Sequence, residues 1–78
     1  MYYVYMLLCK DDTIYTGITT DVDRRLREHR RGIGSNYTRA RHAEKILYTE
    51  RCADRSVASK REAVIKKMSK AEKLALVA

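Results

Sequence analysis

The chain has no proline and only three glycines among its 78 residues, and it contains no linker-like segment, repeat or low-complexity tract. The absence of such breaks predicts a single compact domain over residues 1–78. A domain of this size lies near the limit at which one hydrophobic core gives a useful net stability.

Long apolar runs are also missing. No stretch approaches the roughly 20 apolar residues that a membrane-spanning helix requires. The first ten residues, MYYVYMLLCK, lack the basic start and the small-residue cleavage site of a secretory signal. We therefore expect a cytoplasmic protein without a membrane partner.

Cysteine is scarce, and the two that occur, Cys9 and Cys52, are far apart and fall in predicted strands. This pattern favours two reduced thiols in the core over a disulfide or a metal-binding pair. Neither cysteine has a second cysteine or a histidine cluster beside it, so the sequence predicts no zinc site.

Acidic residues are outnumbered by basic ones, 10 against 17, which gives a formal net charge of +7. A small surface this basic attracts polyanions, because each neutralised phosphate releases condensed counterions. The charge balance therefore favours a nucleic acid as partner over a charge that serves only solubility.

The hydrophobic pattern predicts the order β-β-α-β-α-α. Residues 2–9 are apolar at odd and even positions, as is typical of a central strand covered on both faces. A turn at residues 10–13 leads to a second, hairpin-forming strand at 14–19, and residues 44–52 form a third strand. The predicted fold class is therefore α/β (α+β), with a small three-stranded, mostly antiparallel sheet flanked by helices.

The first helix is predicted to begin after Asp21, a good N-cap, and to end at Gly32 as the C′ residue. Its apolar stripe consists of Val22, Leu26, His29 and Ile33. Arg25 lies beside this stripe and neighbours His29 at i, i+4, whereas Arg30 lies equally near on the other side. Helix geometry alone does not choose between the two arginines.

The second long helix is predicted over residues 55–68, capped by Asp54, and Ser69 with Glu72 forms a capping box for a last short helix. Arg61 falls inside the apolar stripe of the long helix, so that it must either snorkel or pair with another group. That stripe is expected to consist of Val57, Val64, Ile65 and Met68.

Glu62 lies at the edge of the same apolar face. It is either an ordinary boundary residue paired with Lys66 at i+4 or, if it faces the same cleft as Arg25, an oxygen ligand for Mg²⁺.

Two tyrosine tripeptides stand out, Tyr3-Val4-Tyr5 and Tyr15-Thr16-Gly17, followed by Arg25 ten residues after Tyr15 and His29 four residues later. This arrangement resembles the GIY-YIG nuclease domain. The resemblance covers essentially the whole chain and points to the small stand-alone bacterial subfamily, which is similar to the N-terminal domain of the excision-repair nuclease UvrC.

The resemblance implies a role for each of five residues. Tyr5 would be the general base or its hydrogen-bonding partner, and Tyr15 would position or activate the attacking water. Arg25 would hold the scissile phosphate, and His29 would assist proton transfer or orient a tyrosine. Glu62 would be the sole protein ligand of a Mg²⁺ or Mn²⁺ ion.

Some positions depart from the pattern of the family. Tyr3 replaces the glycine of the first tripeptide, and Ile18 stands where UvrC-like members carry a lysine. Lys73 is nearest to the place of an asparagine found in many family nucleases. Gly17 follows the pattern and would let the second strand pack closely at the site.

Contacts with nucleic acid are expected from Arg24, from Lys66 and from a basic loop. In that loop Tyr37 could stack on a base, while Arg39 and Arg41 could contact phosphates.

The predicted function is that of a metal-dependent endonuclease that acts on DNA rather than RNA, with structure-specific cleavage in repair or recombination as the form that we expect. We expect a monomer, with a possible protein partner that supplies specificity. The alternatives are a non-catalytic nucleic-acid-binding module on the same scaffold and a subunit that is active only with its partner.

Overall fold

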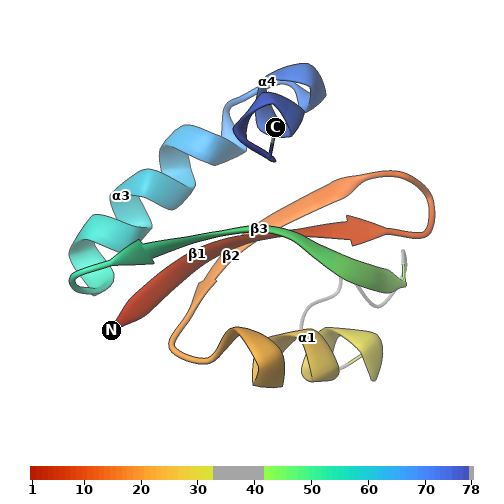
Figure 1. Cartoon of the computed structure of the whole chain (residues 1–78), viewed down its shortest axis with the longest axis horizontal. Coiled ribbons are helices and arrows are strands. Elements are labelled where there is room, and N and C mark those ends of the chain that lie inside the picture. Colours follow the sequence, from red (N-terminus) through yellow and green to blue (C-terminus); the bar gives the residue numbers. More distant parts are fainter. Residues whose placement is uncertain (33–41, 78) are drawn as a thin grey trace.

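The computed structural model describes residues 1–32 and 42–77 and confirms the predicted order β-β-α-β-α-α. The strands are β1 (Tyr2–Cys9), β2 (Ile14–Thr19) and β3 (Ala43–Cys52), and the helices are α1 (Val22–Arg30), α3 (Arg55–Lys66) and α4 (Lys70–Val77). Helix α1 covers one face of the sheet, whereas α3 and α4 lie over the other (Figure 1).

The central strand is β1, which pairs antiparallel with β2 on one side and with β3 on the other. Val4 and Met6 face α3, while Tyr5 and Leu7 face α1, and all four are at most 1% exposed. Since both faces of β1 are covered, the strand needs apolar residues at every position. This explains the unbroken apolar run at residues 2–9.

Helix α3 packs on the sheet through Ala58 and Ile65, which are both 0% exposed. The predicted stripe was right for Ile65 but wrong for Val57 and Val64, which are 48% and 50% exposed. Ala58 and Ile65 each directly follow one of these valines in the sequence. The small side chain of Ala58 lets the helix approach the sheet through this neighbouring line of residues. The helix also ends at Lys66 rather than at residue 68, with Lys67 as its C-cap.

Arg61, on the buried side of α3, pairs with another group. Its Nε donates to Oε2 of Glu50 on β3 at 2.8 Å, and the hydroxyl of Tyr48 donates to Oε1 of the same carboxylate at 2.9 Å. This polar network joins α3 to β3 beside the core.

The predicted helix caps are confirmed. Asp21 and Asp54 accept backbone N–H groups of α1 and α3 at 3.0 and 2.9 Å, and Ser69 with Glu72 forms the reciprocal capping box of α4. Gly32 follows α1 with a φ of 77°, which glycine adopts without strain.

Both cysteines, Cys9 and Cys52, are buried thiols that are not joined in a disulfide, as predicted. Within residues 1–32 and 42–77, no helix has the length and apolar character needed to cross a membrane.

Neighbouring residues of α3 provide a test of this packing. Ile65→Ala removes a fully buried side chain and should lower the free energy of unfolding by about 2–5 kcal/mol. Val64→Ala, at a position that is 50% exposed, should change it by less than about 1 kcal/mol. Urea unfolding followed by circular dichroism measures both, and equal losses would contradict the observed orientation of α3.

Candidate active site

Three aromatic rings from three elements meet between the sheet and α1. Tyr5 of β1 and His29 of α1 are each only 1% exposed, and the Tyr5 hydroxyl lies 2.8 Å from Nε2 of His29. The ring of Tyr15, from β2, lies 5.1 Å from that of His29 and 6.3 Å from that of Tyr5. The structure therefore brings together both tyrosines and the histidine that the sequence singled out.

Gly17 makes room for this cluster. It lies opposite Tyr5 in the β1–β2 ladder, and a Cβ atom at Gly17 would be 2.6 Å from the Tyr5 hydroxyl oxygen and 2.8 Å from its Cζ. Any side chain at this position would displace the Tyr5 ring. The close packing expected of Gly17 is thus an approach of strand backbone to the phenol.

Burial sets the protonation states of the pair. It is the main cause that raises the pKa of Tyr5 to about 12, against which Arg25 acts as a donor and as a positive charge. Burial, followed by the charge of Arg25, lowers the pKa of His29 to about 4. At neutral pH the pair is therefore a phenol and an uncharged imidazole.

The tautomer of the imidazole decides the direction of this hydrogen bond. With the ring proton on Nδ1, Nε2 accepts from the Tyr5 hydroxyl, whereas with the ring proton on Nε2 the phenol oxygen accepts. Only the first of these tautomers lets His29 take a proton from Tyr5.

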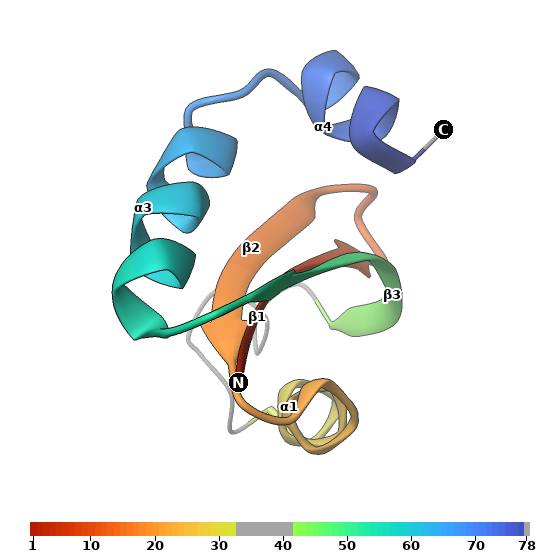
Figure 2. The same cartoon turned by 60° about the vertical axis from the view of Figure 1, so that its left-hand side comes forward.

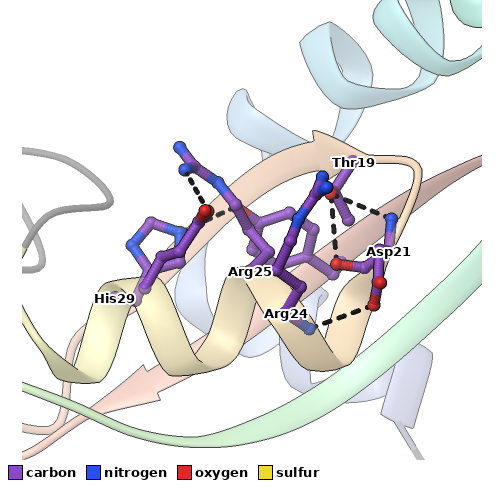
Figure 3. A network of polar contacts seen from close by, with 7 residues as sticks. Thr19, Asp21, Arg24, Arg25 and His29 are labelled. Atoms are coloured by element: carbon purple, nitrogen blue, oxygen red, sulfur yellow. Dashed lines mark hydrogen bonds and ion pairs between the residues drawn. The ribbon is translucent and has the colours of Figure 1, made fainter.

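Arg25 lies at the border between this cluster and the surface. Its Nη1 donates to Oε1 of Glu28 at 3.0 Å (Figure 3), and this hydrogen bond lowers the pKa of the Glu28 carboxyl. Arg30, the other arginine near the apolar stripe, instead donates to the backbone carbonyl of Glu44. The fold thus distinguishes two arginines that helix geometry alone did not.

Glu62 comes from α3, on the other face of the sheet. Its carboxylate pairs with Lys66 at 3.5 Å, and it is also one of the negative charges that raise the pKa of Tyr5. The carboxylate therefore lies within electrostatic reach of the aromatic cluster. Its side chain is 22% exposed, so that one edge is open to solvent.

A lone carboxylate suits one kind of metal site. The part of the chain that the structure describes contains no group of three or more His, Cys, Asp or Glu side chains placed to hold a metal. Mg²⁺ commonly binds proteins through one or two carboxylates and completes its octahedron with water and phosphate oxygens. Glu62 fits that mode of binding and does not fit an all-protein cage.

The residues expected to bind nucleic acid have different outcomes. Arg24 is exposed on α1, and Lys66 is exposed beside Glu62. Tyr37, Arg39 and Arg41 lie outside the described residues.

Two residues near Arg25 were missed by the sequence reasoning. Glu28 could have been found, because it follows Arg25 at i+3. Arg55, which lines the same surface hollow as Arg25, has no such signal, because its approach depends on how α3 packs.

Comparison with known proteins shows the family of the chain. The family model described as the GIY-YIG catalytic domain matches residues 1–75. The chain belongs to the GIY-YIG family. Its site thus occupies a fold whose family model is a catalytic domain.

The relatives are small GIY-YIG proteins. A UPF0213 protein of Natronomonas pharaonis is 49% identical over 77 residues, covering 99% of this chain and 91% of the relative. One of Clostridium perfringens is 42% identical and covers 99% and 83%. The NMR structure of the UPF0213 protein BH0048 from Bacillus halodurans superposes with a TM-score of 0.61 at 42% identity, over 99% of this chain and 83% of that one.

The buried histidine gives a test of the site by pH. The pKa of His29 is lowered from 6.5 to about 4, so the unfolded chain binds more protons than the folded chain between these values. The free energy of unfolding should therefore fall as the pH is lowered from about 6.5 toward 4, with the part due to His29 absent in His29→Gln. NMR of the ring nitrogens should show a neutral His29 at pH 6, and a ring that protonates near 6.5 would contradict its burial against Tyr5.

Proposed function

We propose that this GIY-YIG protein is a metal-dependent nuclease that hydrolyses phosphodiester bonds in DNA. The observation that carries the proposal is the buried hydrogen bond between Tyr5 and a neutral His29, with Tyr15 and Arg25 against it. Buried polar groups in such an arrangement are more than packing requires, and they are the residues to which the resemblance to GIY-YIG nucleases assigns catalytic roles.

The first chemical step needs a base for the attacking water. The raised pKa of Tyr5 means that little phenolate is present at neutral pH. The neutral imidazole offers another route when its ring proton resides on Nδ1. The Tyr5 oxygen then accepts a proton from water as its own proton passes to Nε2 of His29, which must hold that proton against the effects of burial and of Arg25. Tyr15, with its ring against His29, would position the water. On this proposal the relay needs no standing phenolate.

The second requirement is stabilisation of the charge that develops on the phosphate. Arg25 can present a planar, permanently charged guanidinium to phosphate oxygens, at the place where it already acts on Tyr5. Glu62 would hold Mg²⁺ or Mn²⁺, which supplies further charge neutralisation at the phosphate and at the leaving oxygen. Lys66 would then turn away from Glu62 toward the bound DNA strand, where its positive charge suits a phosphate.

DNA is the proposed substrate, with a structural rather than a sequence preference and a role in repair or recombination. The net charge of +7 supports a polyanionic substrate. On this proposal the chain acts as a monomer, and a protein partner can supply its specificity.

The decisive experiment is cleavage of labelled single-stranded, duplex, flap and four-way-junction DNA, and of RNA, with Mg²⁺ or Mn²⁺ at low salt. Wild-type protein should cut at least one DNA substrate only when metal is present. Glu62→Gln and Arg25→Gln should each lower the rate by about 100-fold or more, because each removes stabilisation of the transition state.

The matched controls are Glu44→Gln and Arg27→Gln, which make the same changes of charge at exposed positions. Both should cut at nearly the wild-type rate, with folding of all variants checked by circular dichroism. Wild-type protein that binds these substrates but cuts none of them would overturn the nuclease and favour the non-catalytic binding module.

A further inference from the structure

A surface hollow of about 310 Å³ lies where the sheet edge at the end of β2 meets the beginnings of α1 and α3. We call it the arginine hollow, and its charged lining residues are Arg24, Arg25, Glu28 and Arg55. In Figure 2, β2 lies on the side of the sheet nearer to α3 and runs directly into α1. Arginines from helices on opposite faces of the sheet thus line one hollow.

The charges in the hollow favour an anion. Glu28 is balanced by Arg25 at 3.0 Å, which leaves the positive charges of Arg24 and Arg55. Among the described residues, neither of these two guanidinium groups has a carboxylate within ion-pair distance. A hollow with two uncompensated arginines matches the bidentate recognition of phosphate oxygens.

The turn that leads into α1 is held by hydrogen bonds, which keeps Arg24 in place. The Thr19 hydroxyl accepts from the backbone N–H of Asp21 at 3.1 Å and donates to its carbonyl at 3.3 Å. The Asp21 carboxylate in turn accepts from the backbone N–H of Arg24 at 3.0 Å (Figure 3). The backbone that carries Arg24 is therefore preorganised, and only side-chain freedom is lost on binding.

Arg25 joins the hollow to the aromatic cluster, because it acts on Tyr5 and also lines the hollow. We propose that Arg24 and Arg55 bind the backbone phosphate next to the scissile one on the same nucleic-acid strand. The nucleic-acid strand then crosses the sheet at its β2 edge, with the scissile phosphate at Arg25 and the next phosphate in the arginine hollow. This inference rests on the proposed function for the position of the scissile phosphate, but the phosphate contact itself does not require cleavage.

The test is the salt dependence of binding, measured by fluorescence anisotropy with a labelled single-stranded and a labelled duplex DNA in the absence of metal. Arg55→Gln and Arg24→Gln should each weaken binding and reduce the slope of log K against log salt by about 1. Because both arginines contact the same phosphate, the double variant should also reduce the slope by about 1 and not by about 2. Arg27→Gln, an exposed arginine on α1 that does not line the hollow, should leave the slope unchanged.

Each result of this experiment either supports or overturns the proposal about the arginine hollow. Reduced slopes for Arg24→Gln and Arg55→Gln alone support the hollow, even if the wild-type protein cuts nothing. Unchanged slopes overturn it, even if cleavage that depends on Glu62 establishes the nuclease. A reduction that is equal for Arg27→Gln also overturns it, because a general electrostatic field would then explain the loss. Circular dichroism melting excludes unfolding as the cause.

Discussion

The arrangement of the site depends on one buried hydrogen bond, between the hydroxyl of Tyr5 and Nε2 of His29. Each partner would be costly to bury alone, because a polar group without a hydrogen bond loses its hydration without compensation. Together they satisfy each other at 2.8 Å, at the interface between the central strand and α1. The same burial keeps the phenol protonated and the imidazole uncharged, so packing and proton chemistry have one cause.

Other features of the structure follow from accommodating this pair. Gly17 lacks a side chain where the Tyr5 hydroxyl needs the space, and the ring of Tyr15 packs edge-on against that of His29. Arg25 adds a permanent charge that offsets part of the effect of burial on Tyr5 and also disfavours a proton on His29. The charge of Glu62 acts on the Tyr5 hydroxyl from the opposite face of the sheet. The site is thus assembled from both layers of helices around the sheet.

Much of the fold could be predicted from the sequence, because its signals are local. The unbroken apolar run of β1, the cap residues Asp21 and Asp54 and the capping box at Ser69 each report their own neighbourhood. The orientation of α3 could not be predicted equally well, because Ala58 competes weakly with two valines in any hydrophobicity pattern. In the structure α3 approaches the sheet at the smaller side chain of Ala58, so that Val57 and Val64 stay exposed.

The site was predictable to the extent that its residues share an element or a motif. Arg25 and His29 are one helical turn apart, and the tyrosines stand in recognisable tripeptides. The distinction between Arg25 and Arg30, and the approach of Arg55, depend on distances between elements that no local pattern encodes. The partner of Arg61 was undecidable for the same reason, since Glu50 lies eleven residues away on another element.

Placing Tyr5 on the central strand has a consequence for the dynamics of the site. A strand that pairs on both sides and is covered on both faces exchanges its amide hydrogens only through openings close in free energy to global unfolding. We therefore expect the phenol to lie on the slowest-exchanging part of the molecule, whereas Glu62 lies on a helix with one face in water. Any movement that a reaction requires would involve α3 and the arginine side chains, whereas the phenol–imidazole pair would keep its position.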